Sequence, residues 1–451
     1  MDVSAAGTSP FSLIAAAVRP LSSRVPQTGI QPAMRARWNR ILEVLETNFW
    51  FVPLLMLLAS GALAVFLLYI DQRYDPGVDT TFSWAYSGGP DGARSLLSTI
   101  AGSMITAASV TFSLASVALS IASQQYGSRV LRNFMRDKVT QILLGTFVST
   151  FLYSVLVVRT IRGTDNSSGF VPAISVTVAI VLAVFSLILL VYFIHHVSSS
   201  IQASHIVNVI AEDLEDTIPR LYPSGAGDPF PHTPAFEAFR HRERLTLTSS
   251  RTGYLQSLDL DRLLEIASDC NLIIELSPAP GDHLVQGDPL AHLWGTREVK
   301  EETEHNILGC FLFGGERTPL QDIRYQFQQL TDVIIRALSP GINDPFTAVN
   351  GIDKVASGIA VLAKRPRVSE MREDKSGELR LVLSTPNLTD VLKETVPHIA
   401  IYAAADRFVM ASLRRVLDVA EREQQDDRER LVISQLRKEL DNLQAKTASL
   451  S

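Results

Sequence analysis

Four stretches of the chain are long, apolar and nearly free of charge, which is the pattern of membrane-spanning helices. In the second stretch, for example, no charged residue occurs between Arg94 and Arg129. A helix needs about 20 predominantly apolar residues to cross the hydrocarbon core of a bilayer. The pattern therefore predicts four transmembrane helices, at residues 50–70, 95–123, 139–158 and 170–194.

The second predicted span has a polar face. Small residues recur along it at alternating steps of four and three positions, and all but Gly102 carry a hydroxyl, while other faces hold apolar side chains such as Phe112 and Val117. This spacing places the small residues on one side of a helix. We call these nine positions the hydroxyl seam: Ser95, Thr99, Gly102, Thr106, Ser109, Ser113, Ser116, Ser120 and Ser123.

Two interpretations of the hydroxyl seam are open from the sequence. Small residues let helices approach closely in a bilayer, and their hydroxyls can bond to the helix backbone, so the seam can be a packing surface. A ring of such helices can instead line a pore with weak, uncharged ligands. The first interpretation predicts that the seam contacts other helices without water, and the second predicts that it faces water.

Basic residues predict the orientation of the spans. Lys and Arg are more frequent in the segment before the first span and in the second loop than in the first and third loops. Since cytoplasmic loops are enriched in Lys and Arg, both chain termini are expected in the cytoplasm. The basic residues of the second loop are either part of this topology pattern or a contact with anionic lipid at the membrane surface: Arg129, Arg132, Arg136 and Lys138.

The predicted fold is an α-helical membrane domain followed by a cytoplasmic α+β domain with a small β-barrel-like part and amphipathic helices. The expected divisions are a disordered tail (1–34), the four-helix transmembrane domain (35–200), a connecting helix and Pro/Gly linker (201–234), a small β-rich module (235–319) and a helical part (320–451). The fourth span is expected to continue as a helix to Thr217, and 367–378 to form a charged loop.

The barrel prediction comes from the run between Pro280 and Leu290. Its turn glycines suit a small barrel, and the run resembles the strand-turn pattern of biotinyl/lipoyl-like hybrid barrels. No lysine occurs between Asp282 and Leu290, so we expect a structural barrel without a swinging cofactor.

A helix stop and a helix start lie close together at Ser339–Pro345. Asp344 suits the N-cap and Pro345 the first helical position, where a missing amide costs nothing. The polar residues around this point can form an anion or partner site at the helix start, or they can serve only the cap. The members of this polar junction are Arg336, Asn343, Asp344, Thr347 and Asn350.

Composition narrows the functional classes. The mean hydropathy of +0.16 suits a membrane protein with a large soluble part, and a net charge of −6 with a pI near 5.9 argues against a dedicated nucleic-acid binder. Only Cys270 and Cys310 occur, which predicts no disulfide framework. The sequence contains no Gly-rich phosphate loop, nucleophile elbow, HExxH motif or metal-ligand spacing around His195, His196 and His205. We therefore expect neither an enzyme nor a bound metal or cofactor.

Longer runs of residues resemble a known family. They are "LLSTIAGSMITAASVTFSLASVALSIASQQ" and "RVLRNFMRDKVTQILLG" in the membrane half, and "TGYLQSLDLDRLL" and "RALSPGINDPFTAV" in the other half. These runs are similar to the bacterial membrane proteins grouped as the domain of unknown function 2254 family. The resemblance implies a bacterial inner-membrane protein and brings no established activity.

Two functions from different classes follow. The first is an oligomeric channel or transport-class protein, in which copies of the chain arrange the hydroxyl seam around a path for an ion or small solute and the cytoplasmic domain regulates it. The alternative is a non-transporting membrane anchor that senses or scaffolds through its cytoplasmic domain. Both have the lipid bilayer as a partner, and the first requires a homo-oligomer.

Overall fold

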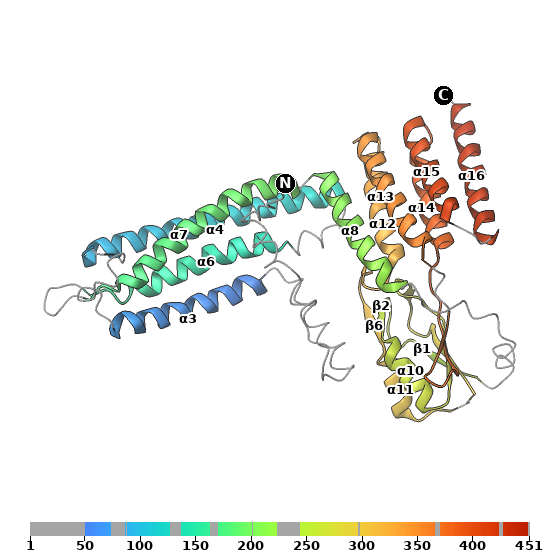
Figure 1. Cartoon of the computed structure of the whole chain (residues 1–451), viewed down its shortest axis with the longest axis horizontal. Helices are drawn as coiled ribbons and strands as arrows, with labels where there is room; N and C mark the ends of the chain where they lie inside the picture. The colour runs from blue at the N-terminus through green and yellow to red at the C-terminus, as the bar shows by residue number, and fades with distance from the viewer. Residues whose placement is uncertain are drawn as a thin grey trace, which may run out of the picture. The chain divides into compact units, whose positions relative to one another are not determined.

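The structure is a computed structural model, shown in Figure 1, in which the chain forms two compact units, residues 1–202 and 203–451. We describe each unit by itself. The described residues are 50–73, 86, 88–126, 137–162, 170–200, 202–222, 244–295, 298–365, 370–423 and 427–449, without the side chains of 122–126 and 198–200. The expected disordered tail (1–34) lies outside them, as do Arg129, Arg132 and Arg136.

The amino-terminal unit consists of packed apolar helices, α3 (Phe51–Arg73), α4 (Pro90–Tyr126), α6 (Lys138–Val158) and α7 (Ala173–Ser200). Helix α6 contacts the other three (Figure 1). It is also the most buried of the four, with half of its apolar stretch inside the unit. One core cluster joins Leu97 of α4 to Tyr153 of α6, and a second joins Met104 to Phe147 of α6 and Phe193 of α7. These helices cover the four stretches that the hydrophobic pattern predicts.

A fifth helix has comparable length and composition. Among the described residues, five helices are long and apolar enough to cross a membrane, and the fifth is α13 (Pro345–Ala363) of the carboxy-terminal unit. From the sequence, this helix is expected in the helical part (320–451) of the cytoplasmic domain. In the structure α13 packs against α8, α12 and α15, and Gly358 leaves room for Leu214 and Phe327 beside its backbone. Its apolar residues therefore have neighbours within the unit.

The carboxy-terminal unit begins with a separate helix. Helix α7 ends at Ser200 and α8 (Ala203–Leu221) follows, so the continuous helix expected to Thr217 is interrupted. The reason is a change in pattern, because α7 is apolar on all sides whereas α8 is amphipathic and buries Ile210 and Leu214 within its unit.

The rest of the unit contains both strands and helices. They are β1 (Arg244–Thr248), β2 (Gly253–Leu258), α10 (Leu260–Asp269), β3 (Ile273–Leu276), β4 (His283–Leu284), β5 (Pro289–Trp294), α11 (Glu301–Leu308), β6 (Phe311–Gly314), α12 (Ile323–Ala337), α13, β7 (Met371–Glu373), β8 (Leu379–Val382), α14 (Leu388–Ala403), α15 (Arg407–Glu423) and α16 (Asp427–Ala448).

The described strands form two sheets and no closed barrel, which corrects the predicted barrel-like part. The five-stranded sheet has the order β1-β5-β3-β8-β7, and the three-stranded sheet has the order β4-β2-β6. The run between Pro280 and Leu290 contributes β4 to the three-stranded sheet and β5 to the five-stranded sheet, so its turn glycines do not close a barrel. Strand β3 lies inside the five-stranded sheet, between β5 and β8. It pairs with β8 in parallel, with Ile274 opposite Leu381.

The hairpin β7–β8 lies where the sequence analysis expects a charged loop at 367–378. Its turn is ordered by Asp374, which accepts hydrogen bonds from the amides of Ser376 and Glu378 and pairs with Arg380 at 2.7 Å. The hydrogen bond from Arg380, with that from Ser376, lowers the pKa of Asp374 well below its usual value. The charged residues are thus the turn of a hairpin within the predicted helical part.

Candidate functional site: the exposed face of α4

Helix α4 packs within its unit through one face and leaves the hydroxyl seam exposed. The packed face is made by Ala93, Leu97, Ala101, Met104, Ala108 and Thr111, which are all buried. The seam from Ser95 to Ser120 is exposed at every position, and Ser123 belongs to α4 but its side chain is outside the described residues. The seam is therefore not the surface by which α4 packs on α6 and α7.

Hydroxyls of the seam bond to their own helix. Thr99 donates to the carbonyl of Ser95 at 2.8 Å, Thr106 to Gly102 at 2.9 Å, Ser109 to Ile105 at 2.9 Å and Ser116 to Phe112 at 2.8 Å. In each case the proton points to the carbonyl four residues earlier, as is common for Ser and Thr in apolar helices. The outward side of each of these oxygens therefore presents lone pairs, which accept hydrogen bonds or contact cations.

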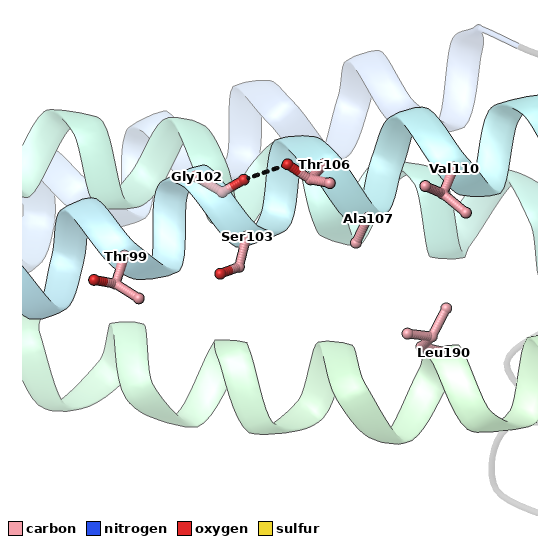
Figure 2. A pocket seen from close by; sticks show the side chains of 7 residues that line it. All are labelled: Thr99, Gly102, Ser103, Thr106, Ala107, Val110 and Leu190. Atoms are coloured by element: carbon pink, nitrogen blue, oxygen red, sulfur yellow. Dashed lines mark hydrogen bonds between the residues drawn. The ribbon is translucent and has the colours of Figure 1, made fainter.

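An open groove of about 680 Å³ lies beside the seam. It is lined by Thr99, Gly102, Ser103, Thr106, Ala107 and Val110 of α4 and by Leu190 of α7. Figure 2 shows these side chains between the two helices, together with the hydrogen bond from Thr106 to Gly102. The absence of a side chain at Gly102 and the short ones around it leave this space between two apolar helices.

A buried carboxylate ties two helices together at one end of the unit. Asp71, in the last turn of α3, is only 3% exposed and accepts hydrogen bonds from the amides of Ile174 and Ser175 and from the Ser175 hydroxyl. These groups belong to the first turn of α7, where free amides attract an anion. Nearby, the Tyr153 hydroxyl donates to the Ser175 carbonyl at 3.0 Å. No local pattern in the sequence marks this role of Asp71, since its partners lie a hundred residues away.

A second carboxylate joins α6 to α7. Asp137 caps α6 through the amide of Val139 and the hydroxyl of Thr140, and both its oxygens lie 3.1 Å from Nε2 of His196. Burial acts to raise the pKa of Asp137, but the hydrogen bond and charge of His196, with the bonds from Thr140 and Val139, hold that pKa below its usual value. His196, considered above as a metal ligand, thus has a carboxylate partner. Lys138, the described member of the basic segment, is half-buried at the first position of α6.

The polar junction is organised by its cap. Asp344 accepts hydrogen bonds from the Thr347 amide at 3.0 Å and the Thr347 hydroxyl at 2.6 Å, and these bonds lower the pKa of Asp344. Asn343 is exposed in a left-handed conformation with φ of 50°, while Arg336 and Asn350 are half-buried. The structure therefore joins Asp344 to Thr347 as the capping interpretation predicts.

An ionic network that the sequence analysis missed fixes the β-rich region to α12. Asp322, fully buried, pairs with Arg317 at 2.7 Å, and Asp282, directly before β4, pairs with Arg324 at 2.7 Å. Burial raises the pKa of Asp322, against the opposing charge of Arg317. Gly281, at φ of +96°, lies directly against the Asp322 carboxylate, where a Cβ would not fit. The turn at Gly281 and Asp282, before β4, thus docks on α12, and the sequence signal was this Gly-Asp pair.

Comparisons with known proteins agree with this membrane architecture. The chain is 31% identical over 393 residues to a protein of Mycobacterium bovis (strain ATCC BAA-935 / AF2122/97) and to one of Mycobacterium tuberculosis (strain ATCC 25618 / H37Rv), both described as uncharacterized. Each match covers 85% of this chain and 74% of the relative. No solved structure matches the chain. The model of the DUF2254 family, described as predicted membrane proteins, matches residues 46–419, and the chain belongs to this family.

Proposed function

We propose that this protein is an oligomeric channel or transport-class protein of the bacterial inner membrane, in which α4 helices from several copies bring their hydroxyl seams together around a path. The observation that carries the proposal is the exposure of the seam. Within one chain the buried face of α4 accounts for its packing, so the seam is left to face lipid, another copy or water.

The chemistry of the seam favours an ion or small solute over lipid. Back-bonded hydroxyls at Thr99, Thr106, Ser109 and Ser116 present acceptor oxygens at intervals along the helix. Small side chains also let neighbouring helices approach closely, which promotes association where lipid provides no hydrophobic drive. Weak, repeated acceptors let a cation or a polar solute enter and leave without being trapped.

The same proposal includes four spans with both termini in the cytoplasm. Helices α3, α4, α6 and α7 cross the membrane, and α13 remains in the carboxy-terminal unit, where Asp353 at its middle pairs with Arg415 of α15. Cytoplasmic termini follow from the distribution of Lys and Arg in the sequence. The carboxy-terminal unit then lies in the cytoplasm and regulates the path.

Ion flux through the purified protein in liposomes tests the proposal. Wild type is compared with Ser113→Leu, which fills the centre of the seam, and with Leu114→Phe, which adds bulk on a different exposed face of the same helix. Under potassium and chloride gradients we expect flux with wild type and Leu114→Phe and its loss with Ser113→Leu.

Folding of each variant is checked by size-exclusion chromatography before reconstitution. Flux that is unchanged by Ser113→Leu would remove the seam from the path. No flux with any variant would make the seam a packing surface and favour the alternative, a non-transporting sensor or scaffold.

A further inference from the structure

Large apolar side chains gather at one end of the helices of the carboxy-terminal unit. Phe346 is 86% exposed and Phe408 is 81% exposed, the highest values among large apolar residues in the described part of the chain. Of the other exposed large apolar residues that the structure describes in this unit, only Val285 and Leu431 lie elsewhere. The members of this apolar end are Ile342, Phe346, Ile401, Tyr402 and Phe408.

Two loops bring these residues to the same end. At its carboxy-terminal end α8 bonds to the residues before α12 and before α14, through Arg220 to the Leu320 carbonyl at 3.0 Å and Tyr222 to the Pro386 carbonyl at 2.6 Å. Helices α12 and α14 therefore start near each other and run in the same direction. The loops that follow them, at 338–344 and 404–406, lie at the opposite end, toward the beginning of α8 (Figure 1).

The two phenylalanines occupy equivalent places on neighbouring helices. Asp353 of α13 pairs with Arg415 of α15 at 3.3 Å, and the two helices pack in the same direction. Phe346 and Phe408 each precede the paired residue of their own helix by seven positions, or about two turns. The rings thus project at the same level from the ends of two packed helices.

The course of the chain puts this end within reach of a bilayer. Helix α7, one of the apolar spans, ends at Ser200, and α8 begins at Ala203. Three residues of chain extend about 10 Å at most. The beginning of α8, and with it the apolar end of its unit, therefore follows a membrane span directly.

Charges around the apolar end suit lipid headgroups. Arg407 is exposed beside Phe408, and Lys446 is exposed in the last turn of α16. Helix α16 runs opposite to α15, as the pairs of Arg414 with Asp441 and Arg437 with Asp418 show, so Lys446 lies at this end. Aromatic residues flanked by cations are typical of surfaces that lie in a membrane interface.

The acids at this end are engaged by the protein. Asp344 accepts the Thr347 amide, and Asp406 accepts the amides of Phe408 and Val409. Both carboxylates cap the helices that carry the exposed phenylalanines. They thereby fix the starts of the helices from which the rings project.

We propose that the apolar end of the carboxy-terminal unit docks on the lipid surface, with Phe346 and Phe408 inserted at the level of the headgroups and Arg407 and Lys446 among the phosphates. The unit is then held against the membrane at a second place besides its covalent connection to α7. This contact is independent of whether the hydroxyl seam conducts.

Site-specific fluorescence in the full chain tests the docking. Exposed Cys270 is replaced by Ser, while buried Cys310 stays unreactive because burial raises the pKa of its thiol to about 12. Phe346→Cys and Phe408→Cys are each labelled with an environment-sensitive dye in nanodiscs of phosphatidylcholine and phosphatidylglycerol. Glu423→Cys, exposed at the other end of α15, is the matched control.

Nitroxide attached to the lipid quenches a dye in the bilayer, and iodide in the buffer quenches a dye exposed to water. We expect the dyes at 346 and 408 to emit at shorter wavelength than the dye at 423, and to be quenched by the lipid nitroxide and not by iodide. Quenching of all three positions by iodide alone would overturn the proposal. Dyes at 346 and 408 shielded from both quenchers would also overturn it, because a protein surface would then cover this end.

Discussion

The carboxylate of Asp71, at the end of α3, receives both the amide and the hydroxyl of Ser175 in the first turn of α7, at 2.9 Å and 2.6 Å. A short charge-assisted bond of this kind at a helix start satisfies amides that have no partner within the helix. The two residues are separated by 104 positions, so this bond fixes the register between α3 and α7.

Removal of this carboxylate should destabilise the helix bundle. Asp71→Ala leaves the Ile174 and Ser175 amides and the Ser175 hydroxyl buried without their acceptor, and we expect a loss of about 3 kcal/mol in the free energy of unfolding. Unfolding by a chemical denaturant in mixed micelles measures this free energy. The control is Asp91→Ala, whose side chain is 98% exposed, and which should cost about 0.5 kcal/mol. Equal losses in the two variants would contradict a special role for Asp71.

Asp137 should make stability depend on pH. Its pKa is lower in the folded protein than the usual 3.8, so the carboxylate stabilises the fold above that pH, and this contribution is lost as the pH falls below 3.8 toward the lowered value. Asp137→Asn should therefore be less stable than wild type by about 2 kcal/mol at pH 6, with a difference that disappears in acid.

A double-mutant cycle identifies the partner of Asp137. If the bond to His196 at 3.1 Å carries the stabilisation, His196→Gln should cost a similar amount, and the double variant should cost less than the sum of the two. Melting temperatures of all four proteins in one detergent give the comparison. Strict additivity, or a difference between Asp137→Asn and wild type that is constant with pH, would assign the stabilisation elsewhere.

Local patterns were enough to predict several elements. The start of α13 at Pro345 with Asp344 as its cap follows from side-chain chemistry within a few residues. The apolar stretches predict α3, α4, α6 and α7 to within a few residues at most ends. Each of these features depends on neighbours in the chain.

Features that depend on distant parts of the chain could not be predicted. The period of small residues on α4 identified the hydroxyl seam, but which face of α4 packs is determined by α6 and α7, and these bury Leu97 and Met104 instead. One of the two partners of β3 is β8, which follows after the helices α12 and α13. The spacing of the turn glycines therefore suggested a barrel that the described strands do not form. The composition of a strongly apolar helix such as α13 also does not distinguish between a surrounding of protein and one of lipid.

The glycines at 281 and 287 allow a test of how the β-rich region docks on α12. Gly281 and Gly287 have nearly the same backbone angle, with φ of +96° and +97°, but Gly281 lies against the buried Asp322 carboxylate whereas no atom lies within 4 Å of the Cβ position at Gly287. Gly287→Ala therefore adds only backbone strain, about 1 kcal/mol. Gly281→Ala adds the same strain and also displaces Asp322 from Arg317, so we expect a total of about 3 kcal/mol. Chemical denaturation followed by tryptophan fluorescence, to which buried Trp294 of β5 contributes, measures both. Equal losses would mean that the close approach of Gly281 to Asp322 contributes nothing to the stability of this unit.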